Sequence, residues 1–393
     1  MVSRHDVSPY DWMVWPEGAL ESALAQGTRR RDVMAYLGEH DFATLAPLAR
    51  AAAHAHRDPE RVVHVVPGFL GSQLGIRRSG NQPPDLLWID PQDFHLGGLA
   101  DLSLQAGLPI VSLGAMPYTY LALKLRLEIA GFTVRWADYD WRRGVEECGA
   151  QLASRIAAEP ARRQYIVGHS LGGLVARAAL AATDAMVERV VTLGTPHRGS
   201  FAAVQALRGS YFIVRHIAQL DPSRSAEDLA REVFASFPSL HQMVPGAVPH
   251  LPWPEGRMHC IAGVGADTVT HATQEGMQFR YDVSRDGDGT VMRSSAVPVA
   301  GKAHYCRTLH AVLPRDPAVA DAVIDLLDRG ATQALPDAPP AVTDAARSIT
   351  DAEMQADCRD KLDWSSLSPT ARRDWFARMN QPIAAGSPLV VQP

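Results

Sequence analysis

The stretch YIVGHSLGGL, residues 165–174, decides the fold. It places Ser170 between Gly168 and Gly172, directly after a β-branched run and directly before a run of helix-forming residues. In a nucleophile elbow, a serine stands on a strained turn between a strand and a helix, and glycines leave room for the neighbouring backbone. An ordinary tight turn is the alternative, because the pattern G-x-S-x-G occurs by chance in roughly one chain of this length in ten. The rest of the sequence has to decide between them.

Apolar runs typical of buried strands alternate with segments of helical spacing through most of the chain. The strand candidates are 61–66, 132–140, 164–167, 188–194, 257–263 and 304–309, and the helix candidates are 120–131, 144–163, 171–182 and 316–330. Such alternation predicts a mostly parallel central sheet with helices on both faces. Asp316 is the expected N-cap of the closing helix, Pro317 its first residue and Gly330 its end.

The sequence suggests three regions. Residues 1–57 are predicted to form a helical N-terminal extension, and residues 58–330 the α/β unit. Residues 331–393 are expected to hold a Pro/Ala-rich linker and a tail with one short helix, opened by Ser368 and Pro369. Residues 84–115 are rich in Pro, Gly and Leu without a clear period, which predicts a long functional loop. This segment and residues 205–255 are the candidate lid or cap segments.

Composition excludes several classes of protein. The chain has 393 residues, 46% of them hydrophobic, which suffices for a large core. A net charge of −5 and the absence of a long Lys/Arg block argue against nucleic-acid binding. The N-terminal residues do not resemble a signal peptide and no apolar run approaches 18 residues, so a cytoplasmic location is expected. The scattered cysteines are interpreted as reduced thiols; they are Cys148, Cys260, Cys306 and Cys358.

A nucleophilic serine needs a base, and the base needs an orienting carboxylate. In α/β-hydrolase order the acid and then the histidine follow the serine. The segment SRDGDGTV, residues 284–291, offers Asp286 and Asp288, although it could instead be a calcium-like or simple Asx turn. His310, between a late strand and the closing helix, is preferred as the base. His304 is expected within or before that strand.

The oxyanion hole needs two backbone N–H groups. Leu171, which follows the nucleophile, supplies one. The segment VVPGFLGSQL, residues 65–74, turns at Pro67-Gly68 and would present the amide of Phe69, unless it is an ordinary β-turn. Leu70 and His169 adjoin these positions and are expected to contact substrate. No metal and no organic cofactor is needed for this chemistry.

Five sequence blocks carry a resemblance to a known family. They are PGFLGSQL (67–74), DYDWR (138–142), GHSLGG (168–173), LGTPHRGS (193–200) and GDGTV (287–291), in this order. Together they resemble the lecithin:cholesterol acyltransferase family, which includes lysosomal phospholipase A2 and bacterial relatives. The match covers about residues 60–330. Residues 1–57 and the tail after about 335 have no counterpart in it, and the signal peptide and disulfides of the secreted animal members are not evident.

The resemblance implies an α/β-hydrolase fold with cap segments that acts on acyl esters of lipids. The family's nucleophile falls on Ser170, its acid on Asp288 rather than Asp286, and its base on His310. Its oxyanion donors fall on Phe69 and Leu171. The segment LLWID, residues 86–90, resembles the family's lid-side tryptophan region, which implies that Trp88 contacts an acyl chain or covers the site.

These residues predict acyl transfer in two steps through an acyl-enzyme, with water or a second alcohol as the acceptor. A soluble carboxylesterase of small or secondary-metabolite esters is one alternative, and a non-catalytic member that binds a lipid or a protein is another. Long acyl chains imply transient contact with a membrane surface. Residues 211–220 and the helix with Trp375 and Phe376 could lie at that surface, but packing on the core is favoured.

Overall fold

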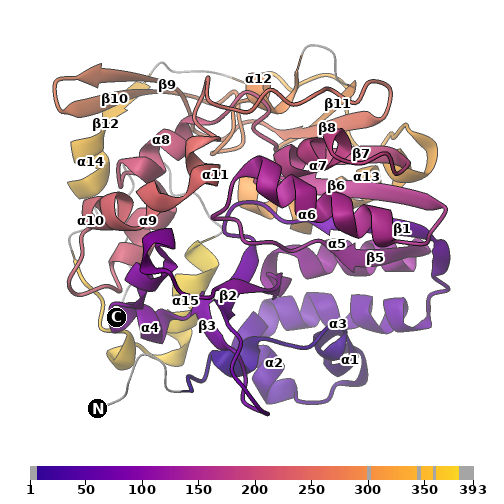
Figure 1. Ribbon diagram of the computed structural model, residues 1–393, viewed down its shortest axis with the longest axis horizontal. Coiled ribbons are helices and arrows are strands. Elements are labelled where there is room, and N and C mark those ends of the chain that lie inside the picture. Colours follow the sequence, from indigo (N-terminus) through magenta and orange to yellow (C-terminus); the bar gives the residue numbers. More distant parts are fainter. Residues whose placement is uncertain (1–6, 299–301, 343–346, 357–359, 380–393) are drawn as a thin grey trace.

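The core of the protein is a six-stranded parallel sheet (Figure 1). The computed structural model describes residues 7–298, 302–342, 347–356 and 360–379. The strands stand in the order β5–β1–β6–β7–β8–β11, and every pairing is parallel. Their bounds are β1 Asp58–Val66, β5 Phe132–Trp136, β6 Arg163–His169, β7 Val187–Leu193, β8 Met258–Gly263 and β11 Lys302–Cys306. This is the sheet of the α/β-hydrolase fold, so the predicted fold class is confirmed.

Helices cover both faces of the sheet, as the alternating sequence pattern predicts. One face packs against α6 (Val145–Ala158) and α7 (Leu171–Ala181), and the other against α5 (Pro117–Ile129) and α13 (Pro317–Arg329). Neighbouring side chains of one strand point to opposite faces. In β6, Ile166 packs with the first pair of helices, while Tyr165 and Val167 pack with the second.

The closing helix α13 begins and ends where the sequence predicts. The Asp316 side chain accepts hydrogen bonds from the amides of Ala318 and Val319, and Pro317 is the first helical residue. Gly330 ends the helix at φ +72°, a left-handed conformation that costs glycine little. The start of α13 fixes the loop before it, in which His310 lies.

The N-terminal residues form three helices that pack on the second layer rather than on the sheet. These are α1 Ala19–Gln26, α2 Arg30–Leu37 and α3 Glu39–His54. Their apolar side chains form one cluster with Leu121 and Leu125 of α5. Figure 1 shows α1–α3 below α5, on the outer side of the molecule.

The segment 84–115 is not the irregular loop that its composition predicts. It contains β3 (Asp85–Trp88), α4 (Pro91–His95), two short 3-10 turns (Gly98–Leu102 and Leu104–Ala106) and β4 (Val111–Ala115). Strands β3 and β4 pair on either side of β2 (Ser72–Ile76) in a small antiparallel sheet. Strands of four or five residues are too short to show a periodic pattern, and the long-range pairing with β2 stabilises them.

A third sheet and part of the tail were also absent from the sequence prediction. Strands β9 (Thr268–Glu275) and β10 (Gln278–Ser284) form a hairpin, and β12 (Arg347–Thr350) of the tail pairs with β10. Helix α14 (Asp351–Ala356) follows β12. The tail helix α15 (Pro369–Arg378) begins as predicted, with the Ser368 side chain accepting from the amide of Ala371 and Pro369 in the first turn.

Short helices between β7 and β8 lie over the carboxyl ends of the central strands. They are α8 Phe201–Leu207, α9 Phe212–Ala218, α10 Ala226–Glu232 and α11 Pro238–His241, and a last short helix, α12 Arg293–Ala296, precedes β11. Trp375 of α15 is fully buried and stacks on His216 of α9, so the helix with Trp375 packs on the core, which was the favoured expectation.

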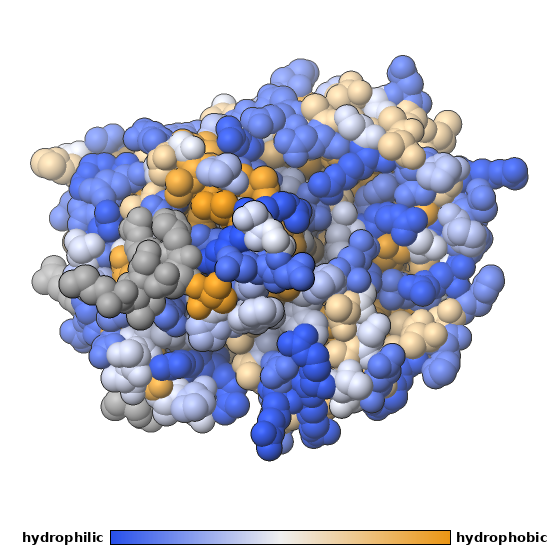
Figure 2. All heavy atoms as spheres, turned by 60° about the horizontal axis from the view of Figure 1, so that its bottom comes forward, coloured by the Kyte–Doolittle hydropathy of each residue, from blue (hydrophilic) through white to orange (hydrophobic). Residues whose placement is uncertain are grey.

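The face of the molecule that Figure 2 shows is mostly polar. Figure 2, seen from the side of α1–α3, shows apolar residues grouped near the centre of that face among charged ones. Within the described ranges, no helix combines the length and the apolar character needed to cross a bilayer. Cys148, Cys260 and Cys306 form no disulfide, whereas Cys358 lies outside the described residues, as do residues 1–6 and 380–393.

Candidate active site

Ser170 stands on a sharp corner between β6 and α7. Its backbone has φ +53° and ψ −124°, a conformation that costs a non-glycine residue of the order of 1–3 kcal/mol. Its amide donates to the carbonyl of Leu193 at 2.8 Å, which ties the corner to β7. A Cβ on Gly172 would lie 2.3 Å from the carbonyl oxygen of Val66, and one on Gly168 would lie 2.8 Å from Gly172 O. The two glycines are therefore required by close backbone contacts, as in a nucleophile elbow.

Asp288 and His310 lie in direct contact near this corner. His310 Nδ1 is 2.8 Å from Asp288 Oδ2, and the aspartate is fully buried. The other carboxylate oxygen, Oδ1, accepts from the amides of Thr290 and Val291 at 3.0 and 2.7 Å. The carboxylate can only accept when ionised, so His310 Nδ1 carries the proton and Nε2 is left as the acceptor.

The structure separates the two alternative residues from this pair. Asp286 forms a bidentate ion pair with Arg293, at 2.6 and 3.0 Å, and makes no contact with His310. His304 lies within β11, where it pairs with Ile261 of β8. Ser170 and His310 line the same cavity. The hydrogen bond between a nucleophile and its base often tightens only when substrate is present.

The block LGTPHRGS, residues 193–200, packs against the acid and base. A Cβ on Gly194 would lie 2.8 Å from Asp288 Oδ2 and 3.0 Å from His310 Nδ1. Ser200 caps α8 and donates from its hydroxyl to the carbonyl of Thr290, in the turn that carries Asp288. This sequence block thus fixes the loop that holds the carboxylate.

The loop of residues 67–72 carries the proposed oxyanion donor Phe69, and three side chains from two other segments hold it. Two come from the block DYDWR: Tyr139 donates to the carbonyl of Pro67 at 2.8 Å, and Trp141 Nε1 to that of Ser72 at 3.0 Å. Trp88 Nε1 donates to the carbonyl of Leu70 at 2.9 Å. Because these donors are buried, they hold the loop in a single position before substrate binds.

The two backbone amides predicted for the oxyanion hole, those of Phe69 and Leu171, donate no hydrogen bond within the described residues. Leu171 is the first residue of α7, where the helix N-terminus favours negative charge. Phe69 is partly buried, and its ring packs edge-on against Trp141 at 5.0 Å between centroids. The use of these two amides as an oxyanion hole stays a prediction.

His169 joins three parts of the site through its two ring nitrogens. Nε2 lies 3.1 Å from the carbonyl of His310, which only accepts, so Nε2 carries the proton. Nδ1 then accepts from the hydroxyl of Tyr120 at 2.9 Å, and that hydroxyl accepts in turn from the amide of Gly68 at 2.8 Å. Burial holds the pKa of His169 well below its usual range, so the ring is neutral at pH 7. Both nitrogens are occupied by the protein, so His169 positions its neighbours rather than hydrogen-bonding a substrate.

Removing one hydroxyl tests this connection. Tyr120→Phe is expected to lower kcat by about tenfold to a hundredfold, because it leaves two buried polar groups unpaired at about 1–3 kcal/mol each. The measurement is kcat with a chromogenic ester, together with the thermal midpoint. Tyr165→Phe is the matched control, since its hydroxyl binds Glu188, away from Ser170. Equal turnover in Tyr120→Phe and wild type would contradict a positioning role.

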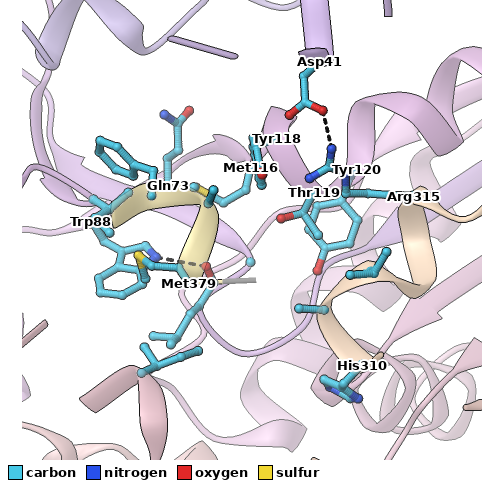
Figure 3. A pocket seen from close by; sticks show the side chains of 18 of the residues that line it. Asp41, Gln73, Trp88, Met116, Tyr118, Thr119, Tyr120, His310, Arg315 and Met379 are labelled. Carbon is cyan, nitrogen blue, oxygen red and sulfur yellow. Dashed lines mark hydrogen bonds and ion pairs between the residues drawn. The ribbon is translucent and has the colours of Figure 1, made fainter. Parts of the chain in front are cut away.

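Ser170 and His310 open into a cavity of about 1140 Å³. Its walls include the three candidate substrate contacts named from the sequence, Leu70, Trp88 and His169, and also Phe69. Figure 3 shows Trp88 and Met379 on one side of it, and Tyr120, Arg315 and His310 on the other. Trp88 is almost fully buried and anchors Leu70, so it forms part of the wall and is not an exposed cover.

Both ends of the described chain contribute to this cavity, which sequence reasoning missed. Residues 35–45 of α2 and α3 form one part, where Asp41 pairs with Arg315 of the loop after His310 (Figure 3). Phe376 and Met379, from the tail helix and the residue that follows it, form another. A helical N-terminal extension and a short tail helix were predicted from the sequence, but no sequence signal places them against the site. The cap residues of 205–255 that line the cavity are Ala206, Tyr211, Phe212, Ile213, Leu240 and Met243.

Over the residues that the structure describes, no group of three or more His, Cys, Asp or Glu side chains is arranged to hold a metal ion. The site thus offers a hydroxyl, an imidazole with its carboxylate, and two backbone amides. Such an arrangement can carry out nucleophilic acyl transfer.

Comparisons with known proteins agree with this fold. Residues 148–220, which include the elbow, match the model of the PGAP1-like alpha/beta domain. Triacylglycerol lipases of Pseudarthrobacter phenanthrenivorans and Burkholderia plantarii are each 42% identical over 55 residues, or 14% of this chain. The match covers 17% and 15% of those lipases, so the chain spans about a sixth of the length of the relatives it matches.

Solved structures give more distant likenesses. The Bacillus licheniformis lipase BlEst2 in its propeptide form aligns with 73% of this chain and 54% of its own, at 18% identity and a TM-score of 0.42. The Tle4–Tli4 complex aligns with 52% of this chain and 57% of its own, at 15% identity and a TM-score of 0.34. The sheet order and the elbow therefore carry the assignment: the protein has the α/β-hydrolase fold, and the relatives that its sequence matches are lipases.

Proposed function

We propose that the protein is a serine hydrolase that cleaves acyl esters of lipids through an acyl-enzyme. The observation that carries the proposal is the buried Asp288–His310 pair at 2.8 Å, beside a strained Ser170 on the wall of the same cavity. A structural serine at a turn needs neither a positive φ nor a histidine whose free nitrogen faces a cavity. The similarity to triacylglycerol lipases supports the same chemistry.

In the proposed first step, His310 Nε2 takes the proton of Ser170 as Oγ attacks the ester carbonyl carbon. Asp288 holds the ring in the required tautomer and stabilises the imidazolium. The carbonyl oxygen becomes an oxyanion that accepts from the amides of Phe69 and Leu171. When the C–O bond breaks, His310 returns the proton to the departing alcohol, and the acyl group stays on Ser170.

In the second step an acceptor resolves the acyl-enzyme. His310 takes a proton from water, whose oxygen attacks the acyl carbon, and then returns it to Ser170 Oγ as the free acid leaves. A second alcohol could take the place of water and yield a new ester. Hydrolysis is the simpler reaction and the one we propose for the protein.

The size and lining of the cavity favour lipid esters over small ones. Ligand pockets commonly span about 300–1,000 Å³, and this one measures about 1140 Å³. Trp88 and Met379 line it on the side away from His310 (Figure 3), and the apolar side chain of Phe376 also lines it. An acyl chain fits such a wall, whereas a small ester would leave most of it in contact with water.

The test is mass spectrometry of lipids after incubation with the protein. Mixed phospholipid and triacylglycerol vesicles are supplied with a hydrophobic alcohol as an optional acceptor. We expect free fatty acid that depends on Ser170, with little new ester. The ratio of acid to ester measures hydrolysis against acyl transfer, and the lipid consumed identifies the head group.

A covalent probe separates two kinds of failure. A fluorophosphonate is expected to add its mass to Ser170, and not to the Ser170→Ala variant. Labelled protein that releases no fatty acid would leave a serine hydrolase of small esters and remove the lipid assignment. Protein that never gains the adduct would contradict the enzymatic proposal altogether and would favour a binding role.

A further inference from the structure

A second cavity, of about 680 Å³, lies behind the loops that carry Asp288 and His310. Gly289 and Leu309, the chain neighbours of those two residues, form part of its wall. Tyr211 and Phe212 line both this cavity and the one that contains Ser170, so they form the partition between the two. None of the chemistry proposed above uses the second cavity.

Arg215 of α9 lines this cavity and is almost completely buried, with 2% of its surface exposed. One guanidinium nitrogen, Nη1, donates to the carbonyl of Met354, whereas the buried Nε has no acceptor. No carboxylate pairs with Arg215 in the described part of the chain. Among the other buried cations there, Lys124 pairs with Glu21 and Arg142 with Asp140. Arg177 has no carboxylate partner among the described residues and donates to the backbone carbonyls of Leu251 and Pro252. Burying an unpaired charge is strongly unfavourable, so Arg215 destabilises the folded protein unless a ligand supplies a counter-charge.

The rest of the cavity lining is also electropositive. It contains three arginines, Arg215, Arg285 and Arg307, against one acid, Asp267. The Asp267 carboxylate is engaged by Arg347 at 2.9 Å and faces Arg285 at 4.0 Å, so it does not neutralise Arg215. Arg307 is exposed at the rim, where its Nη2 donates to a backbone carbonyl.

Apolar side chains complete the lining and define the kind of anion that fits. Val264, Val269, Val283, Phe212 and Met354 share this cavity with the arginines. A hydrated inorganic ion gains little from such walls, whereas a carboxylate with an aliphatic chain can bury its chain there. The planar guanidinium fork matches the two oxygens of a carboxylate or the oxygens of a phosphate.

We propose that this cavity is a binding site for an amphipathic anion, whose carboxylate or phosphate pairs with Arg215 and whose apolar chain lies against the valines. An occupant would contact the loops of Asp288 and His310 from behind and so favour one arrangement of them. Binding itself does not depend on the proposed hydrolysis, because no group of the second cavity takes part in it.

The experiment measures the thermal midpoint of full-length Ser170→Ala protein, which removes turnover as a complication. Decanoate below its micellar concentration, inorganic phosphate and chloride are compared at equal ionic strength. Decanoate is expected to raise the midpoint by several degrees in a saturable way, because a ligand that binds only the folded state stabilises it. A rise with decanoate alone identifies a fatty carboxylate, and a rise with phosphate as well identifies the oxyanion as sufficient.

Arg215→Met in the same background should abolish the decanoate effect. In buffer without either anion its midpoint should equal or exceed that of the parent, because the unpaired buried charge is gone. Arg162→Met is the matched control, since Arg162 is 88% exposed and lies outside both cavities. An equal decanoate effect in Arg215→Met would place the ligand in the first cavity and overturn the proposal, as would no effect in the parent.

A second variant covers the case in which Arg215→Met does not fold. Arg307→Gln changes an exposed residue, so this variant should fold normally. We expect the substitution to weaken decanoate binding by about threefold, which is the contribution of a solvent-exposed ion pair. Isothermal titration calorimetry on folded Arg307→Gln protein measures this directly. Unchanged decanoate affinity would mean that the positive charge of this cavity does not contribute to decanoate binding, which would contradict the proposal.

Discussion

Ser170→Ala is expected to lower ester turnover by about 10⁵-fold, because removing the nucleophile of such a triad leaves only binding and the oxyanion hole. The thermal midpoint should stay within a few degrees of wild type. Ser170 lines the cavity, so removal of its one side-chain oxygen should change the packing of the core little. Initial rates on a lipid ester and a melting curve on the same preparation measure both effects.

Two histidine variants test the assignment of His310 as the general base. His310→Ala should be as inactive as Ser170→Ala, because the serine hydroxyl then has no proton acceptor. His304→Ala is the matched control, since His304 lies in β11 and outside the cavity lining. If His304→Ala is the inactive variant and His310→Ala retains turnover, the assignment of the base is wrong.

Asp288→Asn should cost about 10⁴-fold in kcat with little change in shape. Two backbone amides bind Oδ1 of Asp288, so the amide oxygen of an asparagine will stay there. The NH₂ group then faces His310 Nδ1, which must accept its proton, and the ring proton moves to Nε2. A protonated Nε2 cannot take the proton of Ser170. The pH dependence of kcat, followed to high pH, distinguishes this trapped tautomer from simple unfolding.

Asp286→Asn provides the comparison, because it changes the same chemical group two residues away. It weakens only the ion pair with Arg293, in which both side chains are about one-third exposed. Such pairs are worth about 0–1 kcal/mol, so kcat should stay within about twofold of wild type. A loss in Asp286→Asn as large as that in Asp288→Asn would mean that the turn as a whole, and not the Asp288 carboxylate, supports activity.

Local patterns in the sequence predicted the central sheet, its covering helices and the elbow. A buried strand such as β6 shows a continuous apolar run, and Gly168 and Gly172 mark positions where no side chain fits. Caps such as Asp316 and Ser368 act within a few residues of themselves, so they too were visible. The histidine and aspartate that the structure brings together were chosen from the order of motifs along the chain and from a resemblance.

The supports of the site were not visible, because they depend on contacts between distant segments. Tyr120 looks like an apolar helix residue in the sequence, yet its hydroxyl links Gly68 to His169. The tail helix shows only its own caps, and nothing local indicates that Phe376 lines the cavity. The strands β3 and β4 were not predicted for the same reason. Their stability comes from pairing with β2, which their own short sequences do not indicate.

Segments from opposite ends of the described chain line the cavity, so its walls are completed only after the last of these segments has been synthesised. Trp364 Nε1 donates to the hydroxyl of Tyr10, a contact between residues 354 positions apart. Contacts between residues so far apart in sequence form slowly during folding. The entropic cost of closing the loop itself grows by only about 0.6 kcal/mol for each doubling of its length. During synthesis the sheet that bears Ser170, Asp288 and His310 can assemble before the tail helix emerges. In a nascent chain, Ser170, Asp288 and His310 can therefore come together before Phe376 and Met379 complete the cavity wall. The reactive residues would be in place before the wall that selects the substrate.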